Sequence, residues 1–167
     1  MTGTGLETAR GFFAVGAERM SKSRNLGNLM RSAHAFGAAF TFTVGAMYSA
    51  LEAVADTSRS DQHLPHYDWR SADDLALPRG CVLVGIELVD EATELPRFHH
   101  PARAAYVLGP EKGSLSPEML ARCDTIVKIP TRFCVNVAVA GAIVMYDRLV
   151  SRQPVARLPA LHTVRSR

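Results

Sequence analysis

The chain has 167 residues, 47% of them hydrophobic, with a formal net charge of +3 at pH 7 and an isoelectric point near 9.0. This length and composition predict one compact domain with a substantial core, and a second domain is not needed. The mildly basic charge permits an acidic partner such as RNA, but many soluble enzymes carry a similar charge, so it excludes little by itself.

Apolar runs and turn residues divide the first part of the chain. A short apolar run predicts a strand over 12–15 that ends at Gly16. Apolar residues then recur at helical spacing, which predicts a helix over 25–36 with Gly37 as its C′ residue. A second apolar run predicts a strand over 40–44.

The middle of the chain has weaker patterns. A short helix is predicted over 48–55, followed by a polar loop over 56–62. The segment 65–69 is predicted as a brief edge strand, because proline is confined to the edges and ends of sheets. A serine followed by two aspartates is typical of a helix N-terminus, and we predict a helix over 71–77.

The last part of the chain alternates apolar strands with helices. Strands are predicted over 81–88, 104–108 and 125–129, the first of them apolar enough to be buried on both faces. A helix is predicted over 116–123, with a serine cap and proline in its first turn. With the long helix that starts at Asn136, this alternation predicts an α/β fold with a mostly parallel sheet flanked by helices.

The helix after Asn136 has an unusual distribution of apolar residues. Val137, Ala140, Ile143 and Tyr146 place apolar surface on nearly every side, so we expect this helix to lie inside the fold or in an interface between subunits. We expect a single domain over 1–152, followed by a basic, flexible tail over 153–167 that carries three arginines and two prolines.

The cysteines and the chain's first residues bear on compartment. Cys81, Cys123 and Cys134 form no C-x-x-C pair and are odd in number, which argues against a disulfide framework and a zinc site. Residues 1–10 lack a basic stretch followed by an apolar one, and the apolar run over 133–144 is too short to span a membrane. We therefore expect a cytoplasmic protein with no membrane anchor and no bound metal.

Three polar loops follow predicted strands, where ligands bind in parallel sheets. They cover 25–31, 108–116 and 129–136, and their glycines and helix starts leave backbone groups free to bind a ligand. Neither G-x-G-x-x-G nor G-x-x-x-x-G-K-[ST] is present, so a Rossmann dinucleotide site and a P-loop are not supported.

Together, these three segments resemble the signature motifs of the SpoU family of RNA ribose 2′-O-methyltransferases. The family's first motif, N-x-G-x-x-x-R, is met over 25–31, and its second, L-G-x-E-x-x-G-L-S, over 108–116 with one small variation. The third, I-P-M followed by S-L-N-V-S-V-A and a helix ending in Y-E, is met over 129–147. The matching residues are Asn25, Gly27, Arg31, Leu108, Gly109, Glu111, Ile129, Pro130, Asn136, Val137, Val139, Ala140, Tyr146 and Asp147.

The resemblance implies a SPOUT fold with a C-terminal trefoil knot, a homodimer, and transfer of the methyl group of S-adenosylmethionine to RNA. By position in the motifs, catalytic roles are implied for Arg31, Asn25, Glu111 and Asn136. Contacts to S-adenosylmethionine, chiefly through backbone atoms, are implied for Ile86, Leu108, Gly109, Ile129, Cys134 and Val135.

Arg31 matches the arginine regarded as catalytic in members of this family. A guanidinium hardly deprotonates at neutral pH, so it is poorly suited to be a base. We expect Arg31 instead to hold a phosphate beside the reacting ribose and to stabilise negative charge on the 2′-oxygen. Taken alone, Arg31 could be a solvated helix residue and Asn136 a simple helix cap.

Cys134 replaces the serine of the third motif, and Val135 and Thr131 replace its leucine and methionine. A thiol is a weaker hydrogen-bond donor than a hydroxyl, which leaves open a non-catalytic RNA- or cofactor-binding member of the same fold. For a catalytic member, tRNA is the expected substrate and rRNA the alternative.

Overall fold

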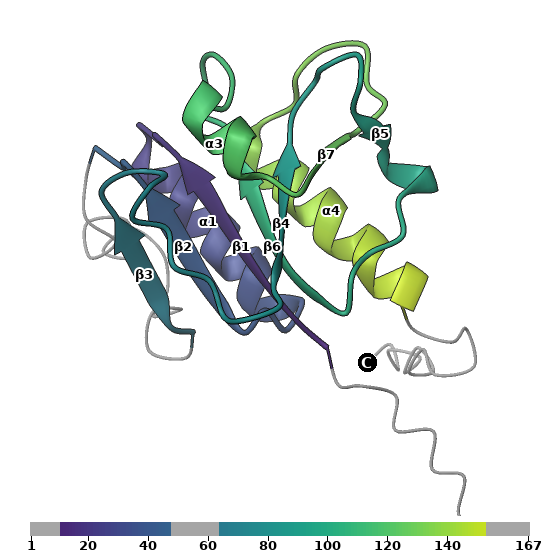
Figure 1. Ribbon diagram of the computed structural model, residues 1–167, viewed down its shortest axis with the longest axis horizontal. Helices are drawn as coiled ribbons and strands as arrows, with labels where there is room; N and C mark the ends of the chain where they lie inside the picture. Colours follow the sequence, from purple (N-terminus) through teal and green to yellow (C-terminus); the bar gives the residue numbers. More distant parts are fainter. Residues whose placement is uncertain (1–10, 48–63, 153–167) are drawn as a thin grey trace, which may run out of the picture.

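The computed structural model describes residues 11–47 and 64–152. In these ranges the chain forms a parallel seven-stranded sheet with the order β3-β2-β1-β6-β4-β7-β5 (Figure 1). The strands are β1 (Phe12–Glu18), β2 (Phe40–Val44), β3 (His66–Trp69), β4 (Val82–Ile86), β5 (Thr93–Glu94), β6 (Arg103–Leu108) and β7 (Thr125–Lys128). The helices are α1 (Ser23–Ala35), α3 (Pro117–Arg122), α4 (Val137–Arg152) and the 3₁₀ turn η2 (Leu95–Arg97). The predicted α/β class is confirmed.

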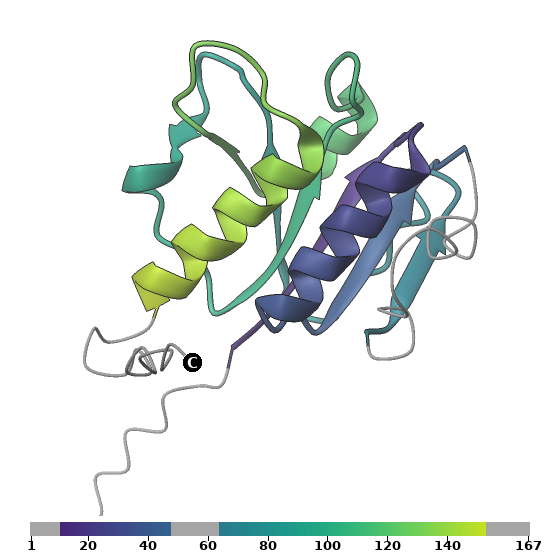
Figure 2. The ribbon, with the colours of Figure 1, turned by 180° about the vertical axis from the view of Figure 1, so that it is seen from behind.

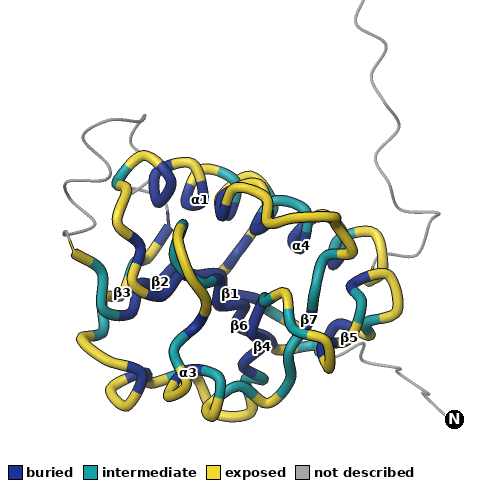
Figure 3. The backbone as a smooth tube through the Cα atoms, turned by 90° about the horizontal axis from the view of Figure 1, so that it is seen from above, coloured by how far each residue is buried: buried dark blue, intermediate teal, exposed yellow. Residues whose placement is uncertain are grey.

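Helices cover the two faces of the sheet unequally. The long helices α1 and α4 lie side by side on one face (Figure 2), and the short helix α3 lies on the other (Figure 3). Strand β1 contributes side chains to the cores on both faces of the sheet, because alternate side chains point to opposite faces. Phe13, Val15 and Ala17 join the core under α1 and α4, whereas Ala14 joins the core on the α3 side.

A glycine lets the two long helices approach closely. A Cβ atom at Gly141 of α4 would come within 2.3 Å of Cδ1 of Leu29 on α1, a distance that real Cβ atoms do not show. The missing side chain therefore makes room for Leu29, which is fully buried between the helices.

Several predicted boundaries need correction. Gly16 does not end the first strand: it lies inside β1, where a side chain would meet the ring of Phe42. The predicted helix over 71–77 was wrong, because only one turn forms there. The Ser71 hydroxyl donates to Asp74 at 2.8 Å, and the guanidinium of Arg122 binds the carbonyl oxygens of Ala72, Asp73 and Leu75.

Other predictions keep their place with small shifts. The strand 40–44 and the edge strand, now β3, are confirmed, while β5 and η2 were missed because each spans only two or three residues. The predicted helix over 48–55, the loop over 56–62 and the tail over 153–167 lie outside the described residues. The trefoil knot and the extent of the domain over 1–152 stay predictions.

A buried polar network fastens α4 to the segment that enters β6. The Nε2 of His100 lies 2.9 Å from Asp147 Oδ2, and its Nδ1 lies 2.6 Å from the Tyr106 hydroxyl. Arg148 donates to that hydroxyl at 3.0 Å and to the carbonyl oxygen of Pro101 at 2.7 Å. Burial raises the pKa of Tyr106 to about 12, so its hydroxyl stays protonated. With Arg148 donating to it, the hydroxyl is free to donate to a neutral His100.

This network predicts a loss of stability in mild acid. Burial lowers the pKa of His100 below its ordinary value of 6.5, although Asp147 opposes the shift. The unfolded chain therefore binds a proton at a higher pH than the folded chain does, and stability should fall as pH drops below about 6.5. The melting temperature, measured between about pH 7 and pH 5, should fall less steeply in His100→Asn than in the exposed control His99→Asn. His66, whose pKa burial also lowers, accounts for a slope that both variants share. Equal slopes in the two variants would exclude His100 as the source.

Candidate functional site

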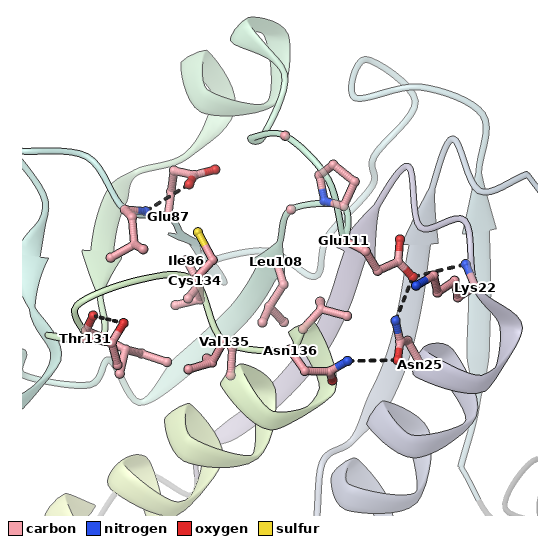
Figure 4. Close-up of a pocket in the computed structure, with 17 residues that line it drawn as sticks. Lys22, Asn25, Ile86, Glu87, Leu108, Glu111, Thr131, Cys134, Val135 and Asn136 are labelled. Atoms are coloured by element: carbon pink, nitrogen blue, oxygen red, sulfur yellow. Dashed lines mark hydrogen bonds between the residues drawn. The ribbon is translucent and has the colours of Figure 1, made fainter.

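A cavity of about 350 Å³ opens at the carboxyl ends of β4, β6 and β7 (Figure 4). The loops that follow these three strands form most of its wall, and the start of α1 and the first turn of α4 complete it. Because β4 lies between β6 and β7 in the sheet, loops distant in sequence meet at this point.

The cavity gathers most of the residues singled out in the sequence. All six expected cofactor contacts line it, as do three of the four residues expected to be catalytic. The expected roles stay predictions, since the structure gives their placement alone. The nine residues are Ile86, Leu108, Gly109, Ile129, Cys134, Val135, Asn25, Glu111 and Asn136.

Arg31 does not line this cavity. It lies in a neighbouring groove between α1 and α4, together with Asn28, Val139 and Tyr146. Asn136 borders both the groove and the cavity. The separation follows from helix geometry, because Arg31 lies six residues after Asn25 in the sequence and therefore on another side of α1.

Three polar side chains tie the site loops together. Glu111 accepts hydrogen bonds from the backbone N–H groups of Ser21 and Lys22, the Ser21 hydroxyl and the Asn25 amide, all between 2.9 and 3.0 Å. Asn25, which is 8% exposed, in turn accepts a bond of 3.1 Å from the amide of Asn136. The first loop is therefore linked to both of the others.

The same bonds set the charge state of Glu111. Partial burial alone would raise the pKa of this carboxyl, but the hydrogen bonds from Ser21 and Asn25 outweigh burial and hold the pKa below its ordinary value. Asn136 also accepts from the N–H groups of Ala138 and Val139 at 2.9 and 3.4 Å, as a helix N-cap does. Asn136 therefore caps α4 and also lines the cavity.

Two further carboxylates hold the loop after β6, and the sequence reasoning missed both. Glu18, at the end of β1, accepts from the backbone and hydroxyl of Ser116 at 2.7 and 2.5 Å. Glu87, directly after β4, accepts from the N–H of Leu115 at 2.8 Å. A carboxylate at the end of a buried strand, or directly after it, is the signal that could have identified them, because the strand ends share one edge of the sheet.

The cavity has the chemistry of a small-molecule site. Ile86, Leu108, Ile129 and Val135 supply apolar surface, and the loops add backbone polar groups. A Cβ atom at Gly109 would lie only 3.2 Å from the backbone nitrogen of Leu115, so glycine keeps this loop tight against the cavity. No histidine lines the cavity within the described ranges.

The described part of the chain offers no metal site and no membrane-spanning helix. It holds no group of three or more His, Cys, Asp or Glu side chains placed to bind a metal ion. Its helices include none long and apolar enough to cross a membrane. All three cysteines are free thiols, and Cys134 lines the cavity.

Comparison with known proteins gives consistent matches. The sequence model of the SpoU rRNA Methylase family matches residues 13–146. Over 147 residues the chain is 26% identical to the mouse (Mus musculus) tRNA (guanosine(18)-2′-O)-methyltransferase TARBP1. The matched region covers 80% of this chain and 9% of TARBP1. It therefore spans a small part of this relative's length.

Solved structures show the same fold. The SpoU methyltransferase AviRb from Streptomyces viridochromogenes, in complex with AdoMet, superposes with a TM-score of 0.75 at 24% identity, over 86% of this chain and 58% of that one. A protein solved in a study of 2-OH methylation of C/U34 on tRNA superposes with a TM-score of 0.69 at 23% identity. That match covers 85% of this chain and 97% of the other.

Proposed function

Because the chain belongs to the SpoU rRNA Methylase family, we propose that it methylates a ribose 2′-hydroxyl of RNA with S-adenosylmethionine as the methyl donor. The observation that carries the proposal is the cavity, where the loops after β4, β6 and β7 bring six residues expected at the cofactor into one wall. Its volume and its mixture of apolar side chains and backbone polar groups fit a ligand of this kind.

S-adenosylmethionine would supply an electrophilic methyl group carried on a sulfonium. The chain's own residues would bind the methyl donor, orient it and hold the site loops in place. Ile86, Leu108 and Ile129 provide an apolar surface for the adenine, and the Gly109 loop provides backbone donors and acceptors. Asn25, Glu111 and Asn136 fix the three loops relative to one another, so that the site is formed before the substrate arrives.

Arg31 is assigned to the RNA. It lies on the far side of Asn136 from the cavity, where a guanidinium can bind a phosphate next to the reacting ribose. Such a contact aligns the 2′-hydroxyl and stabilises developing negative charge without taking up a proton.

For the substrate we propose tRNA, with rRNA as the alternative. TARBP1 is a tRNA methyltransferase, and the protein related to C/U34 methylation on tRNA is matched over nearly its whole length. A non-catalytic binding protein of the same fold is the second candidate function, and the observation that favours it is Cys134 in the place of the family serine. The proposed compartment is the cytoplasm, in line with the free thiols.

We propose that a second copy of the chain packs on the α4 side of the α1–α4 groove and leaves the Arg31 side to the RNA. Val139 is 49% exposed and Tyr146 is 60% exposed on the outer side of α4, an arrangement that leaves apolar surface facing solvent in a single chain. Tyr146→Glu should shift the protein from dimer to monomer in sedimentation equilibrium, with Glu118→Gln on the exposed side of α3 as the control. A monomeric parent protein would contradict the proposal.

Calorimetry with S-adenosylmethionine, followed by methyl incorporation into tRNA and rRNA from cells that lack the protein, tests the function. Binding with methyl transfer to tRNA supports the first candidate, and transfer to rRNA alone supports the alternative substrate. Binding without transfer supports the non-catalytic protein. The absence of binding would overturn the cofactor assignment.

A further inference from the structure

Two carboxylates, Glu87 and Glu111, line the cavity, and they differ in the number of hydrogen bonds that they accept. A carboxylate offers about four acceptor positions. Glu111 fills all four with donors from Ser21, Lys22 and Asn25. Glu87 accepts two hydrogen bonds, one to each oxygen, from the N–H groups of Leu88 at 2.9 Å and Leu115 at 2.8 Å. Glu87 therefore keeps acceptor capacity that Glu111 lacks.

Glu87 also lacks a cationic partner. Among the described residues, no Lys, Arg or His nitrogen lies within 4.0 Å of its carboxylate. Lys22 lines the same cavity, but it lies with Glu111 across the cavity from Glu87 (Figure 4). Glu87 Oε2 lies 3.5 Å from the position of a Cβ atom at Gly109, so the carboxylate is held against the loop of the second motif.

A positively charged ligand group placed beside this half-buried carboxylate would be attracted to it more strongly than in bulk water. We propose that Glu87 selects the charged methyl donor over its neutral product, by attraction to the sulfonium of S-adenosylmethionine. The inference rests on the proposed function and adds a specificity residue to it. Methyl transfer converts the sulfonium to a neutral sulfide, so the attraction acts on the donor and is lost for S-adenosylhomocysteine.

Glu87→Gln tests the proposal with three ligands in calorimetry. Glutamine keeps the size of the side chain and one acceptor oxygen but removes the charge. We expect affinity to fall roughly tenfold for S-adenosylmethionine, as for a partly solvent-screened charge pair. Sinefungin, which carries an amine in place of the methyl sulfonium, should lose affinity to a similar extent. The affinity for S-adenosylhomocysteine should stay within about twofold of that of the parent protein.

The comparison among ligands separates charge recognition from loop support. Glu18→Gln is the matched control, because Glu18 anchors the same loop at Ser116 but does not line the cavity. Any change it causes should be equal for the three ligands. Equal losses for all three in Glu87→Gln would overturn the proposal and assign Glu87 to loop support or to a ligand group that the three share. No loss for S-adenosylmethionine would overturn it as well.

Glu87→Asp keeps the experiment decisive if the glutamine variant does not fold. Aspartate retains the charge, so this variant should keep the parent's preference for S-adenosylmethionine over S-adenosylhomocysteine, and loss of that preference would contradict the proposal. Failure of the parent protein to bind any of the three ligands would refute the proposed function itself. Failure of the charge preference alone would leave that function intact.

Discussion

Replacing Arg31 with lysine will leave the affinity for S-adenosylmethionine unchanged and lower the rate of methyl transfer by about 100-fold. Arg31 lines the α1–α4 groove and not the cavity, so its replacement should not alter the contacts of the cofactor with the protein. Lysine keeps the positive charge but loses the planar, bidentate fork that matches a phosphate. Charge alone will therefore not restore the rate.

Calorimetry and single-turnover methylation of the RNA substrate separate the two effects. Arg97→Lys is a suitable control, because Arg97 is exposed and lies on η2, away from the cavity and the groove. Equal single-turnover rates for the parent and Arg31→Lys would refute the bidentate clamp. A loss of cofactor affinity in Arg31→Lys would instead place the guanidinium at the cofactor.

The centre of the sheet was predictable because strands β1, β2, β4 and β6 are buried on both faces. Runs such as 82–86 and 103–108 are apolar at nearly every position. Errors arose where a local signal served another purpose. The Ser71 hydroxyl bonds to Asp74, and Gly16 makes room for Phe42 inside a strand.

The cavity was predictable in outline for a related reason. Carboxyl ends of parallel strands share one edge, so the loops after β6 and β7 were expected to meet. The role of Glu87 was hidden, because it depends on β4 lying between β6 and β7, an order that the sequence does not state. Arg31 lies in the groove and not in the cavity because residues of one motif need not share a helix face, and its role stays a prediction.

The site and the far end of the sheet are joined through α4. Asn136 caps the start of this helix at the cavity. Arg148, near the end of the helix, is bonded to the carbonyl oxygen of Pro101 in the segment that enters β6. These bonds hold α4 near both of its ends, at the cavity and beside the segment that enters β6.

Arg148→Met is expected to lower the free energy of unfolding by about 3 kcal/mol. Arg148 is 5% exposed, and its guanidinium donates to the carbonyl oxygens of Phe12, Pro101 and Ala102 as well as to the Tyr106 hydroxyl. It also lies 5.3 Å from the centre of the Phe13 ring. Methionine nearly fills the volume but donates no hydrogen bond, so these buried acceptors lose their partner.

Urea unfolding at neutral pH measures the loss, and an unchanged m-value would show that the folded state remains as compact as in the parent. Arg152→Met is the matched control, because Arg152 is exposed in the same helix and makes one hydrogen bond, to the carbonyl oxygen of His100 at 2.9 Å. Its cost should stay below about 1 kcal/mol. If the two variants lost equal stability, the buried guanidinium would not be the anchor of α4, and the apolar contacts between α4 and the sheet would have to hold the helix by themselves.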